Sequence, residues 1–346
     1  MDVLTKGIAI FVVFAVLQAG SIMGNTKDPE EAENNSLTPV RFGMNWVPQP
    51  DHGGYYQASV SGLYKECGLE VQIIPGSVRS SGRKKLLVGK LDFYMGGNVI
   101  APFAMAARGL PIKVIAAHFQ RAPQVIMSHP GRFDTFESLK GAKIFLSDGI
   151  FNSYFRLMVA KFGFRREQRR PYNLISFLSD LDSAHQGVVT AEPFAVEKQA
   201  GFKPKVHLLS RMSLTSYASL IETTDHMLSR SPDLVQCFVD ASAKGWYIYL
   251  YGDNSLANAA IKKDNPDISE AQLQHAVAAM KEYGIVDSGD ALLQGIGAMT
   301  HERMKAYFDK LVSAGILDED IDYKKAYTLE FVNKRVGIEL KKRLVH

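Results

Sequence analysis

Short apolar runs alternate with longer segments of helical periodicity along most of the chain. The first unit is an apolar run over residues 40–46, a helical pattern over residues 53–66 that ends at Gly68, and a second apolar run over residues 70–74. Such alternation is typical of strands joined by crossover helices on a parallel sheet. The pattern predicts an α/β fold with mixed, mostly parallel sheets.

The same pattern continues through the next segments of the chain. It predicts a helix over 80–88, a strand over 91–95, a helix over 99–108 and a strand over 113–117. A second set begins at 136–139, with strands at 143–146, 173–177, 188–190 and 206–209 and a helix over 152–162 closed by Gly163. A strand at 216–222 follows, and everything from Pro232 onward has helical periodicity, which we expect to pack on the first set.

The order of these elements predicts two lobes. We expect residues 40–120 and 216–346 to form the first lobe and residues 121–215 the second. The chain then crosses between the lobes twice, around 119–125 and around 213–216. Closure of two lobes about a pair of connecting segments is an established way to bury a small ligand.

The N-terminal 25 residues have the character of a signal peptide. Lys6 precedes an apolar run over residues 7–19, and small residues follow it. The run is too short for a membrane-spanning helix, which needs about 20 residues. Residues 26–39 are polar and acidic and are expected to form a flexible spacer. We therefore expect an exported protein of the periplasm.

Charge and cysteine content exclude several classes of function. The net charge is only +4, and the basic residues are scattered except for Arg165, Arg166, Arg169 and Arg170. A solvated face explains this cluster better than nucleic-acid binding does. The two cysteines, Cys67 and Cys237, lie in helical patterns, and burial as small apolar side chains is favoured over a disulfide. The histidines have no Cys or His at metal-ligand spacing, so no metal site is expected.

The segment after the first predicted strand is the richest in candidate binding residues. Asn45 can both donate to and accept from the edge of a heterocycle, and Trp46, Tyr55 and Tyr56 can stack on a planar ligand. The carboxyl end of a parallel strand is where ligands bind in such folds. Trp46 and Tyr56 can equally be core aromatics.

Glycines and helix starts supply the second group of candidates. Asp92, Gly97 and Asn98 belong to a segment that contains a glycine pair. Such a pair lets a ligand approach the backbone closely, although plain turns use glycine pairs too. Ser147, Asp148 and Gly149 precede a helix whose free backbone donors suit an anion or a carbonyl, and helix capping explains the first two equally well.

Three further candidates come from the second predicted lobe. Phe151 and Tyr154 would add aromatic surface to a cleft, or belong to the core. Glu192 follows a short strand, where its carboxylate can accept from an amino group or simply face solvent.

Asp51 and His52 have the chemistry for acid and base work, but no Ser or Cys nucleophile motif accompanies them. The residues therefore give no support for catalysis or for a cofactor.

Several motifs together resemble one protein family. The most specific are residues 44–50 (Met-Asn-Trp-Val-Pro-Gln-Pro), 53–58 (Gly-Gly-Tyr-Tyr-Gln-Ala) and 62–71 (Gly-Leu-Tyr-Lys-Glu-Cys-Gly-Leu-Glu-Val). Supporting segments are residues 89–93, 139–144, 311–317 and 326–331. On these residues the chain resembles the thiamine-pyrimidine-precursor-binding branch of the ABC transporter substrate-binding proteins, which shares its fold with the yeast-type pyrimidine synthases.

The resemblance implies a fold, a site and a partner. The implied fold is the two-lobed periplasmic-binding-protein type II fold, with Asn45 and Trp46 helping to hold a pyrimidine ring. The implied protein is a monomer that passes a small molecule to an ABC transporter permease in the inner membrane. Related proteins bind riboflavin, sulfonates or nitrate, so the resemblance leaves the ligand open.

The synthase branch is implied to need residues that this chain lacks. It uses a lysine for pyridoxal phosphate, a histidine four positions later and a cysteine-rich loop. The matching positions here are Gly97 and Ala101, and ordinary residues occupy 212–217. We therefore expect a binding protein, not an enzyme.

Overall fold

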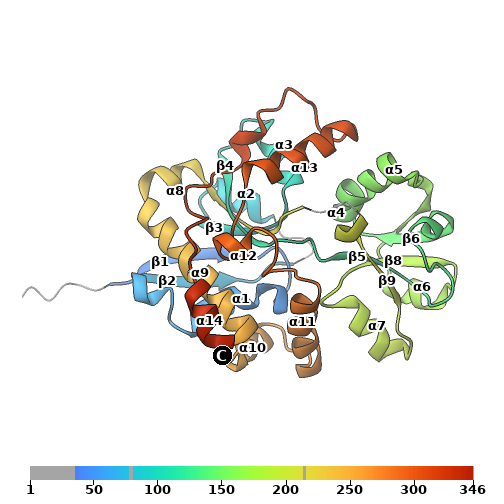
Figure 1. Ribbon diagram of the computed structural model, residues 1–346, viewed down its shortest axis with the longest axis horizontal. Coiled ribbons are helices and arrows are strands. Elements are labelled where there is room, and N and C mark those ends of the chain that lie inside the picture. The colour runs from blue at the N-terminus through green and yellow to red at the C-terminus, as the bar shows by residue number, and fades with distance from the viewer. Residues whose placement is uncertain (1–35, 78–80, 213–215, 346) are drawn as a thin grey trace, which may run out of the picture. The chain divides into compact units, whose positions relative to one another are not determined.

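The computed structural model describes residues 36–77, 81–212 and 216–345. The expected signal peptide over residues 1–25 lies outside the described residues, as does most of the expected spacer over 26–39. Within the described part, the first strand already begins at Thr38, slightly earlier than the apolar pattern predicts. The described strands form two five-stranded sheets (Figure 1).

The first sheet has the strand order β2-β1-β3-β10-β4. Its strands are β1 (Thr38–Gly43), β2 (Leu69–Ile74), β3 (Phe93–Asn98), β4 (Ile112–Phe119) and β10 (Ala218–Thr224). Strand β1 pairs in parallel with β2 and β3, whereas β10 is antiparallel to both of its neighbours. Four strands therefore run in one direction and one in the other.

The second sheet repeats this arrangement in the order β7-β6-β8-β5-β9. Its strands are β5 (Gln124–Ser128), β6 (Lys143–Leu146), β7 (Arg169–Pro171), β8 (Ser183–Val188) and β9 (Lys205–Leu208). Here β5 is the antiparallel strand. The prediction of an α/β fold with mixed, mostly parallel sheets is confirmed.

The chain crosses between the sheets twice, from β4 to β5 and from β9 to β10. Residues 213–215 of the second crossing lie outside the described residues. The division into lobes at residues 40–120 with 216–346, and at 121–215, stays a prediction.

Helices accompany both sheets (Figure 1). The helices between strands of the second sheet are α4 (Asp148–Ile150), α5 (Arg156–Phe162), α6 (Leu174–Ser179) and α7 (Glu192–Ala200). The other helices are α1 (Gly53–Val60), α2 (Gly82–Leu87), α3 (Ile100–Ala106), α8 (Asp225–Arg230), α9 (Pro232–Tyr251), α10 (Ser255–Asp264), α11 (Glu270–Glu282), α12 (Ala291–Gln294), α13 (His301–Ser313) and α14 (Ile338–Val345).

Helices α1 and α9 pack unusually closely because of glycine. A Cβ on Gly53 would meet the ring of Tyr249 at 2.1 Å, and a Cβ on Gly54 would meet Trp246 at 2.2 Å. The glycine pair thus has a packing role, since it lets α1 lie directly against the aromatic face of α9. This contact fixes the helix that follows the candidate binding segment.

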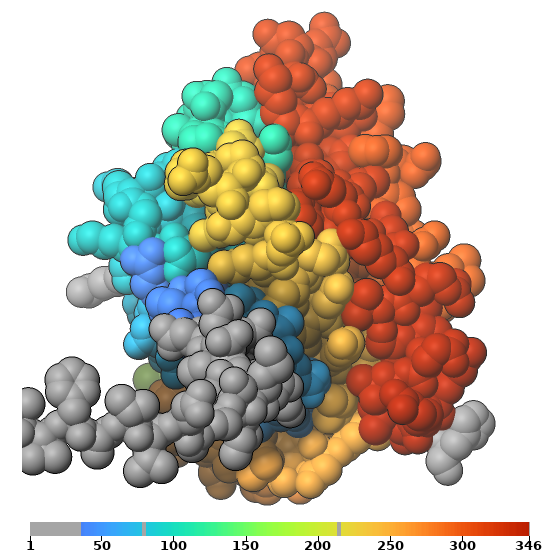
Figure 2. All heavy atoms as spheres, turned by 90° about the vertical axis from the view of Figure 1, so that its left-hand side faces the viewer, coloured from blue at the N-terminus to red at the C-terminus, as the bar shows by residue number. Residues whose placement is uncertain are grey.

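The C-terminal helices cover α9. Helix α14 contacts α9, and Figure 2 shows the end of the chain lying beside the segment that contains α8 and α9. Helices α9 and α10 in turn contact α1, so the expected packing of the C-terminal segment on the first set of elements is seen for these two helices.

Several predicted elements differ from the structure. Residues 173–177, predicted as a strand, lie mainly in helix α6, because the Asn173 side chain accepts from the Ser176 N–H at 3.0 Å and caps a helix there. Strands β5 and β7 were not predicted. The predicted helix over 53–66 ends at Val60, and the glycines expected after a strand lie within β3.

The cysteines also differ from expectation. Cys67 and Cys237 form a disulfide, with their Cα atoms 6.1 Å apart. The expectation of two buried thiols is wrong, because Cys67 lies on an exposed turn against the first part of α9. Pairing 170 positions apart depends on the packing of α1 and α9, which no local pattern reveals.

Candidate functional site

A cavity of about 330 Å³, called the cleft below, is lined by residues of both sheets. Its lining residues are Asn45, Trp46, Gln49, Asp51, His52, Met95, Gly97, Asn98, Phe119, Pro123, Gln124, Ser147, Gly149, Ile150, Ser153, Gln186, Gly187, Val188, Glu192, Ala218 and Ser219. The cleft lies at strand ends because β1, β3, β6 and β8 all finish there. Carboxyl ends of parallel strands are the usual ligand sites of α/β folds.

About half of the residues predicted from the sequence meet in this cleft. They are Asn45, Trp46, Gly97, Asn98, Ser147, Gly149 and Glu192. The Trp46 side chain is 41% exposed, so it is available to a ligand and is not a core aromatic. A Cβ on Gly97 would find only the Asn45 Nδ2 atom, at 4.0 Å, so the glycine leaves open space in the floor.

Three predicted tyrosines lie in the core and do not line the cleft. The Tyr55 hydroxyl is hydrogen-bonded to Ser219 Oγ at 3.1 Å, and the Tyr56 hydroxyl donates to Asp264 at 2.7 Å. Tyr154 is fully buried, with its hydroxyl 3.0 Å from Ser216 Oγ. The two tyrosines of α1 are buried because the helix is drawn against the core by the glycines before them.

Two predicted carboxylates are held by arginines outside the cleft. Asp92 receives a bidentate contact from Arg41 at 2.8 and 3.0 Å. Asp148 is exposed and pairs with Arg169. Neither carboxylate lines the cleft, because each is turned toward its own surface cation.

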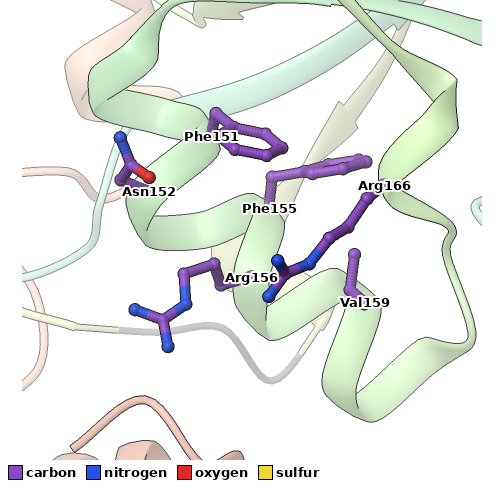
Figure 3. A pocket seen from close by; sticks show the side chains of 6 residues that line it. All are labelled: Phe151, Asn152, Phe155, Arg156, Val159 and Arg166. Carbon is purple, nitrogen blue, oxygen red and sulfur yellow. The ribbon is translucent and has the colours of Figure 1, made fainter.

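Phe151 lies in a different hollow, shown in Figure 3 and called the arginine pocket below. Its volume is about 240 Å³, and it is lined by Phe151, Asn152, Phe155, Arg156, Val159 and Arg166. The two phenylalanine rings stack with centroids 5.8 Å apart. Phe151 is turned there because residues 151–155 form a π-helical turn, which changes the phase of the helix that follows Ser147.

Asp51 is a cleft residue that we did not select from the sequence as a binding residue. Its carboxylate accepts from Thr190 Oγ1 at 3.0 Å and from Gln49 Nε2 at 2.6 Å. Burial is the main reason that the pKa of Asp51 is raised to about 7; the nearby charge of Glu192 also raises it, while the hydrogen bonds from Thr190 and Gln49 lower it. The Thr190 contact joins the segment after β1 to the segment after β8, so it links the two sheets across the cleft.

Glu192 begins helix α7 and faces the cleft. One carboxylate oxygen accepts from the Val188 N–H at 2.7 Å. Burial raises the pKa of Glu192 above its ordinary value, while the Val188 hydrogen bond lowers it. The cleft therefore holds two carboxyl groups with raised pKa values, Asp51 and Glu192.

His52 and Ser219 are also additions to the predicted set. His52 is 1% exposed, and burial lowers its pKa to about 3, so its ring is neutral at ordinary pH. Ser219 has a φ of 48° and is skipped in the pairing of β10 with β3, where Ala218 pairs with Asn98 and Leu220 with Gly96. Strained backbone of this kind is often found at binding sites. Proximity to Asn45 in the chain was the available signal for His52, whereas nothing local marks Ser219.

Apart from one histidine, the ionisable side chains that the structure places in the cleft are acidic. Among the described residues that line it, none is lysine or arginine, although Asp51 and Glu192 are present. Its remaining polar groups are amides, hydroxyls and one neutral imidazole. The cleft can therefore accommodate a neutral or protonated ligand better than an anion.

Two further features of the described residues bear on function. No group of three or more His, Cys, Asp or Glu side chains in the described ranges is placed to hold a metal ion. Within the same ranges, every helix is too short or too polar to span a bilayer.

Comparison with known sequences gives partial and full-length relatives. The 4-amino-5-hydroxymethyl-2-methylpyrimidine phosphate synthase THI11 of Saccharomyces cerevisiae is 30% identical over 111 residues, which are 32% of this chain and 32% of the synthase. The chain thus matches about a third of that relative. The riboflavin-binding protein RibY of Chloroflexus aurantiacus is 22% identical over 96% of this chain and 98% of RibY.

Comparison with solved structures identifies the fold. The periplasmic aliphatic sulphonate-binding protein SsuA of Escherichia coli superposes with a TM-score of 0.62 at 12% identity, covering 84% of this chain and 92% of SsuA. This likeness shows the periplasmic-binding-protein fold. The model of the family described as NMT1/THI5 like matches residues 49–252, more than half of the sequence. The chain therefore belongs to the NMT1/THI5-like family.

Proposed function

We propose that this protein is the solute-binding component of an ABC-type importer and binds a small planar nitrogen heterocycle, such as a thiamine pyrimidine precursor, in the cleft. The observation that carries the proposal is the charge of the lining: the described residues of the cleft include Asp51 and Glu192 but neither lysine nor arginine. Carboxyl groups accept hydrogen bonds from amino groups and stabilise a protonated ring.

The shape and surface of the cleft support a flat ligand. Trp46 offers an exposed aromatic face, and Met95, Phe119 and Ile150 supply apolar contacts. A volume of about 330 Å³ is at the lower end of the usual range for ligand pockets, which favours a single ring over a larger molecule.

The same lining argues against sulfonate or nitrate. An anion in a buried site needs a cation or several converging N–H donors to offset its desolvation. The described lining offers two carboxyl groups instead, and these repel an anion whenever they are ionised. SsuA shares the fold, and a shared fold does not carry the ligand with it.

Riboflavin is a second candidate ligand, favoured by the full-length match to RibY. An isoalloxazine ring would also stack on Trp46 and donate from its ring N–H to a carboxylate. It would require the cleft to open further than the described cavity allows. Direct binding measurements separate the two heterocycles.

A role as an enzyme has less support. The position that a pyridoxal-phosphate lysine would occupy is Gly97 in the cleft floor. The two cysteines of the chain form a disulfide and supply no cysteine-rich loop. We infer that the ligand is bound and released unchanged.

The proposal includes a location and a partner. A cleaved signal peptide over residues 1–25 would deliver the protein to the periplasm, where it would act as a monomer. It would present its ligand to a permease in the inner membrane. The N-terminal sequence supports the location, and the fold shared with SsuA supports the partner.

Isothermal titration calorimetry with purified protein tests the proposal. The ligands are formylaminopyrimidine, hydroxymethylpyrimidine, riboflavin, an alkanesulfonate and nitrate. We expect heat with a pyrimidine and none with the two anions. Tight binding of the sulfonate with no response to any heterocycle would overturn the ligand class, and a Schiff-base absorbance band with pyridoxal phosphate would revive the enzyme.

A further inference from the structure

Two side chains that line the cleft each have a buried atom with no hydrogen-bond partner among the described residues. The atoms are Nδ1 of His52 and Oε1 of Gln124. No other described residue that lines the cleft has such an atom. A buried polar atom without a partner destabilises the protein, so an occupant of the cleft that bonded to both atoms would offset that cost.

The hydrogen bond of His52 to Asn45 determines what its free nitrogen can do. Nε2 lies 3.4 Å from Asn45 Oδ1, which can only accept, so Nε2 carries the proton. Burial keeps the pKa of His52 at about 3, so the ring is neutral and has one N–H. Nδ1 is then an acceptor alone.

The orientation of Asn45 supports this assignment. Its Nδ2 atom is the nearest heavy atom to the open space beside Gly97. The amide therefore offers its oxygen to His52 and its N–H groups to the floor of the cleft. The segment after β1 therefore contributes an amide donor from Asn45 as well as an acceptor from His52.

Gln124 provides the second acceptor from the other sheet. It is the first residue of β5 and is half-buried, whereas His52 follows β1 in the first sheet. The two orphaned acceptors thus belong to segments on opposite sides of the cleft. A ligand that satisfied both would need hydrogen-bond donors on two of its edges.

We infer that His52 Nδ1 and Gln124 Oε1 accept hydrogen bonds from the bound ligand and select a nitrogen heterocycle that carries N–H donors on two edges. This inference rests on the proposed function and deepens it, because it names the residues that distinguish an amino-substituted ring from its alkylated counterpart. A site built to bond an N–H group rejects an analogue that lacks it, since its own polar atoms are then left unpaired.

The test compares two probes by calorimetry: 4-amino-5-hydroxymethyl-2-methylpyrimidine and its 4-dimethylamino counterpart, which has lost both amino hydrogens. For the unaltered protein we expect the amino compound to bind about 10- to 100-fold more tightly, the effect of one or two hydrogen bonds in a buried site.

Variants of each acceptor then complete a double-mutant cycle with the probes. Gln124→Met keeps the length of the side chain and removes the acceptor, whereas Gln124→Glu keeps an acceptor. His52→Gln places an amide near the Nε2 position, and His52→Asn places one near Nδ1. We expect Gln124→Met and His52→Gln each to reduce the preference for the amino probe about tenfold. Gln124→Glu and His52→Asn should retain most of that preference.

Gln57→Met is the matched control. Gln57 also has a buried Oε1 without a partner, but it lies outside the cleft. It should leave the preference between the probes unchanged. Thermal unfolding of every variant confirms that a loss of binding is not a loss of fold.

The outcomes are distinguishable. Coupling between the amino hydrogens and at least one of the two residues supports the inference. Binding of the amino probe with additive effects at both positions, as expected if ordered water satisfies these atoms, overturns the inference and leaves the proposed function intact. Absence of binding by either probe to the unaltered protein contradicts both.

Discussion

The cleft and the arginine pocket are lined by opposite faces of one helical stretch. Ser147, Gly149, Ile150 and Ser153 face the cleft, whereas Phe151, Asn152, Phe155, Arg156 and Val159 line the arginine pocket (Figure 3). The face toward the cleft is small and uncharged. The other face is aromatic and cationic, and Arg166 adds a second guanidinium to it.

The difference shows how the chain separates its charges. The guanidinium groups of the arginine pocket lie near the surface, where solvent screens them. The cleft is lined by carboxyl and amide groups instead. Of the two hollows, the cleft is the one whose lining suits a donor-rich ring. The comparison can therefore be tested by changing charges on either side.

The largest effect is expected at an arginine beneath the cleft floor. Arg83 is held by Glu222 through contacts of 2.6 and 2.7 Å, and the Glu222 side chain is completely buried. Glu222→Gln would leave the guanidinium without its counter-charge and should lower the free energy of unfolding by about 3–5 kcal/mol. Urea denaturation measures this change.

The control for Glu222 is a more exposed pair. Asp92→Asn removes the charge that pairs with Arg41, whose side chain is 44% exposed, and should cost at most about 1 kcal/mol. Equal effects of the two variants would mean that burial does not make the Arg83–Glu222 pair more important for stability than the exposed pair.

The next effect concerns pH and Asp51. Its pKa is raised from 3.8 to about 7 by burial, so the folded protein keeps a proton that the unfolded chain loses above about pH 4. This contribution to stability is complete at low pH and is lost as pH rises through 7, amounting to about 2–4 kcal/mol. The free energy of unfolding of the unaltered protein minus that of Asp51→Asn should fall over this range. A difference that does not change with pH would contradict a buried, protonated Asp51.

Glu192 should contribute less to folding and more to binding. Glu192→Gln keeps an oxygen to accept from the Val188 N–H but removes the charge that faces the cleft. The affinity for a pyrimidine should fall by about 1.5–3 kcal/mol, the value of a charge-assisted hydrogen bond. Calorimetry checks this, with thermal unfolding as the control for the fold. Unchanged affinity would place Glu192 outside the ligand contacts.

The sequence predicts the strand ends at the cleft but not the rotation of the side chains there. Ser147 and Gly149 follow β6 directly, so the end of the strand determines their place. Phe151 and Tyr154 lie beyond, where the π-helical turn alters which face points to the cleft. Apolar periodicity cannot reveal such a turn, because apolar residues recur every three to five positions in both an α-helix and a single π-helical turn.

Contacts between distant segments limited the prediction in a second way. The hydrogen bond between Thr190 and Asp51 joins residues that are 139 positions apart in the sequence. It explains why Asp51 is buried in the cleft. Tyr55 and Tyr56 are in the core because α1 packs on α9, far along the chain. Local patterns therefore gave the α/β fold and the binding segment, while the buried carboxyl group required the tertiary structure.

Trp46 tests the aromatic side of the cleft. Because the ring is 41% exposed, Trp46→Ala should leave the unfolding midpoint almost unchanged. It should weaken heterocycle binding by about 1–3 kcal/mol if the ring stacks on the ligand. Val47→Ala is the matched control, since Val47 is 39% exposed and does not line the cleft. Equal affinity of the two variants would remove stacking from the account of binding.

The smallest effect is expected in the arginine pocket. Arg166→Ala removes an exposed guanidinium that lies outside the cleft, so the affinity for a pyrimidine and the free energy of unfolding should each change by less than about 0.5 kcal/mol. Calorimetry and urea denaturation of this variant, beside Glu192→Gln, measure the contrast between the two hollows. A marked loss of pyrimidine affinity would show that the arginine pocket takes part in binding.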